Sequence, residues 1–528
     1  MYDILFKNAR IVDGTGNPSF YGDVAVEAGR IAAVGKLAER EAHRTLDLAG
    51  LVMSPGFIDL HTHSDFTLPL FPRAASMVRQ GVTTQLVGNC GFSPFPVVPE
   101  RLDMLKAYAA FIDAGLSWEW RSLGDFARLL ESIPLATNVA MQVGHGTVRI
   151  AVMGFENRDP TLTEVSAMEN FVAQAMEDGA FAFSSGLIYV PGIYSQTAEL
   201  VALASVAAKY GGFYSSHIRG EGDTLLDAVG EALTVGREAK LPVQLSHHKA
   251  NGKKNWGKIT TSLSMIDASR EAGHDVLADQ YPYTAGSTTL AAVLPSWSVE
   301  GGISSMVARL NDPETRGRIK GELDEPEENG LEFDLTTIMI SSIPEGPNKK
   351  FEGQMLTAIA EQKGMTPVEA ALDLLANESG GIQMITFSMD EADVRQVMRH
   401  PAVAVASDGW TLSPESGGRP HPRSYGTYVR VLGKYVREEK VLRLEDAVRK
   451  MSSLPAQRLG RYDLGLIRPG CVADLVVFDP DKVGDRSTFQ NPHQYAAGVH
   501  HVIVNGQLVI ENETDTGAVA GKVLRRGR

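Results

Sequence analysis

Eight short apolar runs, separated by longer stretches that include helical patterns, constrain the fold of this 528-residue chain more than any other feature. Alternating strand and helix patterns are typical of βα units around a parallel sheet. Eight units predict an α/β fold, a (β/α)8 barrel of TIM type, with its active site at the C-terminal ends of the strands. The expected strands are residues 57–63, 83–90, 139–145, 180–187, 213–217, 243–247, 276–281 and 403–408.

Three intervening stretches have a clear helical pattern. In residues 163–178, Met168, Val172 and Met176 recur at the spacing of one helix face, and Gly179 follows as a stop signal. Residues 196–210 and 224–240 repeat the plan. These helices supply the return crossovers that a parallel barrel requires.

The two ends of the chain differ from this middle. Residues 1–55 and 465–528 contain short apolar bursts divided by Gly, Asn and Pro, and Asn505-Gly506 marks a tight hairpin. We expect one small β-sandwich domain built from both ends, with the metal-dependent barrel spanning residues 56–464.

A long stretch interrupts the last barrel unit at about residues 286–350. Ordinary βα loops have about 2–6 residues, so this stretch predicts an inserted subdomain. We expect it to fold over the barrel mouth and close the active site, as lids do in other enzymes. A solvated excursion or an oligomer contact is the alternative.

Five of the eight runs end in metal-binding side chains. Side chains alternate along a strand, so His61 and His63 point the same way. Alone, each residue has a structural alternative, such as a packed Cys90 or a helix-capping Asp408. A barrel brings all of them to one mouth, and their donor atoms are those that Zn²⁺ takes in proteins, which predicts a zinc site. The six candidates are His61, His63, Cys90, His217, His247 and Asp408.

Charge and cysteine content narrow the class of partner. The net charge is −14 and no basic cluster is present, which argues against nucleic acid or an anionic membrane surface. Cys90 and Cys471 are the two cysteines, too few for a disulfide framework. The N-terminal residues lack a signal-peptide pattern and no run reaches transmembrane length, so a cytoplasmic protein is expected.

With these motifs in place, the chain resembles the amidohydrolase superfamily and, within it, the D-aminoacylase (N-acyl-D-amino-acid deacylase) family. The resemblance covers nearly the whole length. Its motifs are residues 13–18, 55–65, Gly88-Asn89-Cys90-Gly91, residues 143–147, Ser216-His217-Ile218-Arg219, Leu245-Ser246-His247-His248-Lys249, residues 281–286, Ser407-Asp408-Gly409, His421-Pro422-Arg423 and residues 465–478.

The resemblance implies how the metal ligands are divided. Hydantoinase-like relatives bridge two metals with a carboxylated lysine at the end of strand four, but residues 181–187 contain no lysine. In D-aminoacylases a strand-two cysteine takes that place, which corresponds to Cys90. Cys90, His217 and His247 would then hold a tight zinc. His61, His63 and Asp408 would surround a second, weaker position.

The expected reaction is zinc-dependent hydrolysis of the amide bond of N-acyl-D-amino acids. Zn²⁺ lowers the pKa of bound water to about 7 and polarises a carbonyl. Asp408 is the one acid among the six candidates, so we expect it to act as general base and then general acid. By resemblance, the substrate pocket comprises Lys249, Tyr281, Tyr283, Ser287 and Arg423. His145 matches a family motif and is expected beside the metal ligands or among them.

Two other functions stay open at this point. A D-residue dipeptidase, or another amide hydrolase of the superfamily, shares the same chemistry. A non-catalytic oligomeric scaffold protein is the second alternative, although such proteins usually lose metal ligands. The D-preference comes from the family alone. The residues leave open the side chain and acyl group of the substrate, the number of zinc ions required and the oligomeric state.

Overall fold

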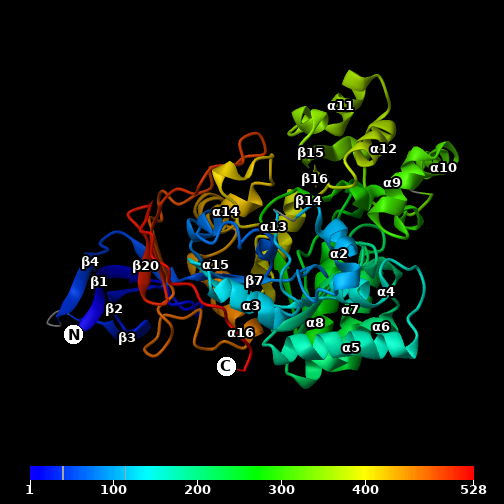
Figure 1. Cartoon of the computed structure of the whole chain (residues 1–528). Coiled ribbons are helices and arrows are strands. Elements are labelled where there is room, and N and C mark those ends of the chain that lie inside the picture. The colour runs from blue at the N-terminus through cyan, green and yellow to red at the C-terminus, as the bar shows by residue number, and fades with distance from the viewer. Residues whose placement is uncertain (38–40, 113–114, 327, 528) are drawn as a thin grey trace.

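The computed structural model describes residues 1–37, 41–112, 115–326 and 328–527. In Figure 1 a β domain containing the N-terminus lies on the left, a barrel with its surrounding helices lies in the centre and right, and a further lobe stands at the top right. No helix within the described residues is both long and apolar enough to cross a membrane.

The barrel has eight strand positions, and each coincides with one of the runs predicted from sequence. Neighbouring strands pair in parallel around the ring. The ring closes between its ends, where Thr62 and Gly409 form a parallel bridge. In ring order the strands are β6 (Phe57–Asp59), β7 (Val82–Val87), β8 (Asn138–Met141) with its continuation β9 (Val143–Gly144), β10 (Ala182–Gly186), β11 (Phe213–His217), β12 (Val243–Leu245), β13 (Val276–Gln280) and β17 (Val403–Val405).

The three predicted crossover helices are confirmed as α5 (Leu162–Glu177), α6 (Thr197–Lys209) and α7 (Leu225–Ala239). In α5 a capping box formed by Thr161 and Glu164 satisfies the first backbone N–H groups, and Met168 lies on the buried face. The other barrel helices are α1 (Ala75–Val78), α2 (Leu102–Ala109), α3 (Leu123–Glu131), α4 (His145–Met153), α8 (Ile259–Glu271), α13 (Glu391–Arg399), α14 (Arg423–Arg430), α15 (Leu444–Met451) and α16 (Ser453–Leu459).

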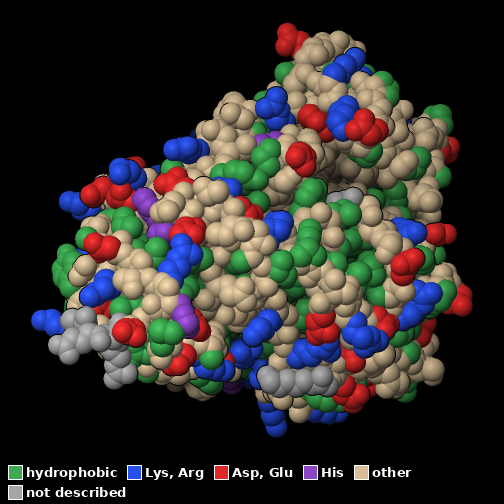
Figure 2. All heavy atoms as spheres, turned by 60° about the vertical axis from the view of Figure 1, so that its left-hand side comes forward, with side chains coloured by type: hydrophobic (Ala, Val, Ile, Leu, Met, Phe, Trp, Pro, Cys, Tyr) green, Lys and Arg blue, Asp and Glu red, His purple; other side chains and the backbone are tan. Residues whose placement is uncertain are grey.

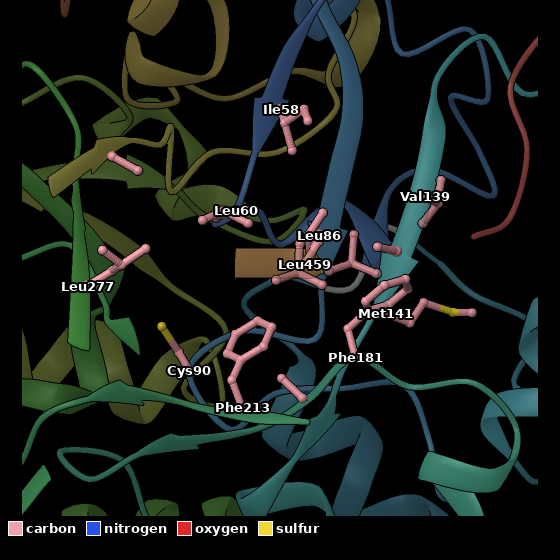
Figure 3. Close-up of a cluster of buried hydrophobic side chains, with 14 of the residues drawn as sticks. Ile58, Leu60, Leu86, Cys90, Val139, Met141, Phe181, Phe213, Leu277 and Leu459 are labelled. Atoms are coloured by element: carbon pink, nitrogen blue, oxygen red, sulfur yellow. The ribbon is translucent and has the colours of Figure 1, made fainter. Parts of the chain in front are cut away.

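Buried apolar side chains fill the space around the barrel strands. Figure 3 shows Leu459 of α16 among Leu86, Met141 and Phe213, which come from three separate strands or their flanks. Cys90 lies at the edge of this cluster and is 2% exposed. The packed interior supports the polar strand ends at the mouth.

Both chain ends form the small β domain, as expected. Within the described residues it is one nine-stranded sheet, in which β5 pairs with β18 and so joins the two ends. Asn505 and Gly506 have φ values of 48° and 81°, the conformation that a tight β19–β20 hairpin requires. The strands are β1 (Tyr2–Ile11), β2 (Phe20–Glu27), β3 (Arg30–Gly35), β4 (Ala42–Asp47), β5 (Val52–Pro55), β18 (Leu475–Phe478), β19 (Val499–Val504), β20 (Gln507–Glu511) and β21 (Thr514–Asp515).

The inserted subdomain forms the top lobe of Figure 1 and projects from the molecule in Figure 2. It has an antiparallel sheet in the order β14–β16–β15 and a hydrophobic core of its own. The predicted insertion, about residues 286–350, covers its first part, and the sheet continues to Thr386. Its elements are β14 (Gly286–Thr289), α9 (Ile303–Asn311), α10 (Pro313–Asp324), β15 (Ile338–Ser342), α11 (Leu356–Lys363), α12 (Pro367–Asn377) and β16 (Gln383–Thr386).

Candidate metal centre and active-site pocket

The six predicted metal-binding residues lie together at the C-terminal ends of five barrel strands, and every one is buried. His217 is the last residue of β11, and His247 follows β12 by two residues. A backbone hydrogen bond joins the first and last barrel strands at the mouth: the Asp408 N–H donates to the carbonyl of His61 over 2.8 Å.

The six side chains form two groups of potential metal ligands that share Cys90. One group is Cys90 with His217 and His247, and the other is Cys90 with His61, His63 and Asp408. Within each group the donor atoms all lie within 4.8 Å of one another. Cys90 Sγ lies 3.2 Å from His61 Nε2 and 3.6 Å from His247 Nε2. A single sulfur therefore stands between two possible metal positions.

Three of these residues have an unusual backbone conformation. The φ values are 55° at Cys90, 34° at His247 and 51° at Asp408, in the region that side-chain-bearing residues rarely adopt. Such strain costs on the order of 1–3 kcal/mol per residue and gathers at functional sites. Here it turns three donor side chains toward a common centre at the point where each strand ends.

The charge of the cluster fits a cation. Burial alone would raise the pKa of the Cys90 thiol, but the neighbouring His61 and hydrogen bonds with His217 and His247 hold it well below its usual value. Thiolate, imidazole and carboxylate form a donor set suited to Zn²⁺. These residues therefore fit the metal that the sequence predicts.

Two carboxylates that the sequence reasoning missed orient the histidines. Asp279, on β13, has one oxygen 3.2 Å from His61 Nδ1, and it accepts the His247 N–H over 2.7 Å. Glu221 lies 2.9 Å from His247 Nδ1. A carboxylate on the second ring nitrogen fixes the tautomer and direction of a metal-binding imidazole. The signals were an acid within the apolar run at 276–281 and an acid four residues after His217.

An inner cavity of about 50 Å³ opens over this cluster, and four of the five predicted substrate residues line it: Lys249, Tyr281, Ser287 and Arg423. Two cations lie close to the Tyr281 ring, with Lys249 Nζ at 5.6 Å and the Arg423 guanidinium carbon at 4.8 Å from its centroid. Lys249 is paired with Glu221, and Arg423 Nη1 lies 2.7 Å from Asp408 Oδ2.

The other two candidates lie elsewhere. Tyr283 is not among the described residues that line the inner cavity, and its hydroxyl lies 3.5 Å from the Pro422 carbonyl oxygen. Its predicted contact with substrate stays a prediction. His145 begins α4 instead of ending a strand, and its Nε2 pairs with Glu199 at 2.8 Å. Within the described residues it belongs to neither metal-binding group.

Strand four has the predicted composition, with no lysine in β10. Ser184 on this strand binds the loop that carries Cys90. The Ser184 hydroxyl donates to the Gly88 carbonyl and accepts the Gly91 N–H over 3.2 Å. Strand four therefore holds the cysteine loop in position.

A closed (β/α)8 barrel with buried histidine, cysteine and aspartate donors at its mouth defines a metal-dependent barrel enzyme. The chain belongs to the amidohydrolase family, whose sequence profile matches residues 44–510.

Three relatives show where the chain lies in this family. It is 35% identical to D-aminoacylase of Alcaligenes xylosoxydans xylosoxydans, over 99% of this chain and 98% of that protein. It is 38% identical to N-acyl-D-glutamate deacylase of the same organism, over 99% and 96%. The crystal structure of N-acyl-D-glutamate deacylase from Bordetella bronchiseptica, with zinc and a phosphonate mimic of the tetrahedral intermediate, superposes with a TM-score of 0.84 at 35% identity, covering 99% of both chains.

Proposed function

We propose that this protein is a zinc-dependent N-acyl-D-amino-acid deacylase, which hydrolyses a linear amide to a carboxylate and a free D-amino acid. The observation that carries the proposal is the position of Cys90, which belongs to both buried groups of metal-binding side chains. The inner cavity that Cys90 lines is also lined by the cations Lys249 and Arg423. Full-length similarity to D-aminoacylase and N-acyl-D-glutamate deacylase supports the substrate class.

Each of the two donor groups would hold one metal ion. Cys90, His217 and His247 would hold the tight zinc, and His61, His63 and Asp408 would complete a second position with the same sulfur. When bound, zinc supplies a Lewis acid and makes a nearby water more acidic. Asp279 and Glu221 keep His61 and His247 in the required orientation.

Asp408 is the proton carrier in this mechanism. Burial would raise its pKa, but the Arg423 guanidinium and His61 hold that pKa well below its usual value, so the carboxylate is ionised and carries no proton before the reaction. It takes the proton of the attacking water as the oxygen bonds to the amide carbon. It then gives the proton to the leaving nitrogen as the C–N bond breaks, which releases a neutral amine.

Lys249, Arg423, Tyr281 and Ser287 form the recognition site for the substrate carboxylate. Arg423 is 1% exposed, and its buried Nε has no hydrogen-bond partner among the described residues. An unpartnered buried donor is costly, and a carboxylate satisfies it in the fork geometry that arginine favours. This end of the inner cavity therefore suits the α-carboxylate that all N-acyl amino acids share.

The proposal is tested by turnover of paired N-acetyl-D- and N-acetyl-L-amino acids, with Met, Leu and Glu side chains, using protein of measured zinc content. D-selective turnover is the expected result. If the zinc-loaded protein turns over neither series, the assignment as a hydrolase still stands but N-acyl amino acids are rejected as substrates. D-residue dipeptides would then be the favoured substrates. Protein that binds no zinc and turns over nothing would favour the scaffold alternative.

We also place the enzyme in the cytoplasm. Both cysteines are free and buried. A thiolate ligand such as Cys90 is best preserved where thiols stay reduced.

A further inference from the structure

A second and larger cavity adjoins the inner one. This outer chamber has a volume of about 770 Å³, against about 50 Å³ for the inner cavity. The two share Phe92, Phe111, Ile188, Tyr189 and Phe333 in their walls. Pockets for small-molecule ligands measure about 300–1,000 Å³, so the outer chamber alone is large enough for a substantial organic group.

The chamber lies between the inserted subdomain and the barrel. Its subdomain wall comes from η5 (Leu290–Val293), η6 (Ser296–Val299) and the segment around Leu331, and its barrel wall includes residues of α2 and α7. Phe155 and Leu294 are among its buried apolar residues. The predicted lid thus provides one side of a chamber that continues from the metal centre.

The charges of the chamber exclude an anionic group. Arg219 is the one basic residue among the described residues that line it, and this guanidinium is already paired with Glu231 and donates to the carbonyls of Ile193 and Ser195, each over 2.9 Å. The acids in the lining are Asp223, Asp227, Glu231, Glu322 and Glu332. A carboxylate would meet negative charge there, whereas an apolar chain would contact Phe92, Leu294 and Phe333.

Barrel topology gives the direction of a bound substrate. Phe92 and Tyr189 line both cavities. They follow the second and fourth strand positions, β7 and β10. Lys249 and Tyr281 follow β12 and β13, the sixth and seventh positions, and Arg423 begins α14 beyond β17, the eighth. The aromatic wall and the cations therefore occupy opposite halves of the ring.

The metal centre lies between these halves. The Phe92 ring is 6.3 Å from that of His63, and the Tyr189 ring is 5.1 Å from that of His217. In a linear N-acyl amino acid the acyl chain leaves the amide carbon on the side away from the nitrogen and its carboxylate. With the carboxylate beside Lys249 and Arg423 and the amide at the metal centre, the acyl chain points past Phe92 and Tyr189.

We propose that the outer chamber binds the acyl chain, so that the enzyme prefers N-acyl-D-amino acids with extended apolar acyl groups over N-acetyl ones. This inference rests on the proposed function and defines its substrate class. The substrate side chain then stays on the inner-cavity side, where residues of β14 and β16 belong to the lining. Each methylene of the acyl chain that becomes fully buried strengthens binding by about fourfold at most.

The test is kcat/KM of the zinc-loaded enzyme on N-acetyl-, N-butanoyl-, N-octanoyl- and N-dodecanoyl-D-alanine, in which the side chain stays one methyl. We expect at least about a tenfold gain from acetyl to octanoyl. Ala292 lines the chamber, and Ala292→Trp fills part of it. This variant should remove most of the gain from acetyl to octanoyl. Ala272→Trp, at the exposed end of α8, is the matched control and should behave as wild type.

A second substrate series separates the acyl chain from the side chain. N-acetyl-D-alanine, -leucine and -phenylalanine extend the side chain at constant acyl length. If Ala292→Trp impairs this series and spares the acyl series, the chamber holds the side chain and the inference is wrong. Equal kcat/KM for acetyl and octanoyl substrates would also overturn it.

Binding of the free acids keeps the inference independent of turnover. Calorimetry should show that octanoate binds more tightly than butanoate, with a more negative heat-capacity change, and that Ala292→Trp removes the difference. If no N-acyl-D-amino acid is turned over but octanoate still binds in this way, the proposed function fails and the chamber assignment stands. If octanoate and butanoate bind equally, the chamber assignment fails whatever the reaction.

Discussion

The carboxylate of Asp408 joins Arg423 to the metal-binding histidines. Its Oδ2 lies 2.7 Å from Arg423 Nη1, and its Oδ1 lies 3.3 Å from the Nε2 atoms of both His61 and His63. One side chain therefore contacts both the proposed carboxylate-binding site and the second metal position. A proton held on Asp408 lies between Arg423 and the two histidines.

Asp408→Asn should reduce kcat by at least about 10²-fold, since an amide cannot accept the proton of the attacking water. The tight group of Cys90, His217 and His247 is unchanged, so much of the zinc should remain. Steady-state kinetics with metal analysis of the same preparation checks both statements. Near-normal turnover would show that another group carries the proton.

Cys90→Ala should remove more metal than loss of any other ligand, because this sulfur alone belongs to both donor groups among the described residues. His63→Ala affects one group only and is the natural comparison. Metal content after dialysis should fall to near zero in Cys90→Ala, whereas His63→Ala should retain the tight metal. Equal retention in the two variants would contradict a shared sulfur.

Glu221→Gln should lower kcat/KM by about 10- to 100-fold, the usual effect of losing a carboxylate that supports a metal-binding histidine. Glu221 lies half-buried between His247 and Lys249, and Lys249 and His247 hold its pKa well below the usual value although desolvation alone would raise it. The neutral amide leaves Lys249 without its counter-charge.

Two readouts separate this positioning role from general damage. Zinc affinity should fall in Glu221→Gln, and the thermal midpoint should change little. The exposed Glu238→Gln on α7 is the control and should match wild type in both kinetics and zinc binding. Unchanged zinc affinity and KM in Glu221→Gln would show that Glu221 does not support His247.

The barrel could be predicted because each buried parallel strand is a short run of apolar residues that can be recognised in the sequence. Five of the eight apolar runs end in a metal-binding side chain, so His217 and Cys90 could be placed at the mouth without knowledge of the packing. His145 shows the limit of this reasoning. A Gly-His-Gly sequence reads equally well as a strand end or a helix start, and the structure places it at the start of α4.

Other features depend on contacts between distant segments and leave no local pattern. Glu221 is one acid among 64 Asp and Glu residues, and its role follows only from the approach of the β12 loop that carries His247 and Lys249. The outer chamber needs the inserted subdomain to meet the barrel loops. Tyr283 follows Tyr281 by two residues and its hydroxyl lies 3.5 Å from the Pro422 carbonyl oxygen, so its contact with substrate stays a prediction.

Asp474 lies at the contact between the β domain and the barrel, and its titration predicts a pH dependence of stability. It lies immediately before β18, is 5% exposed, and accepts hydrogen bonds from Asn138 of β8 over 2.8 Å and from the Asn505 N–H over 2.6 Å. Burial raises the pKa of this carboxyl from 3.8 to about 7 in the folded protein. Between these values the folded state holds a proton that the unfolded state has released.

The sign of the resulting pH dependence follows directly. A group with a raised pKa in the folded state stabilises the fold below the unfolded pKa, and this contribution is lost as pH rises through the folded pKa. Between about pH 4 and 7 Asp474 should therefore make the free energy of unfolding fall with rising pH, by at most about 1.4 kcal/mol per pH unit. Asp474→Asn removes the titrating group, so its thermal midpoint should vary less with pH than that of wild type. The exposed Asp481→Asn should keep the wild-type slope, and identical slopes for wild type and Asp474→Asn would show that Asp474 stays ionised throughout this range.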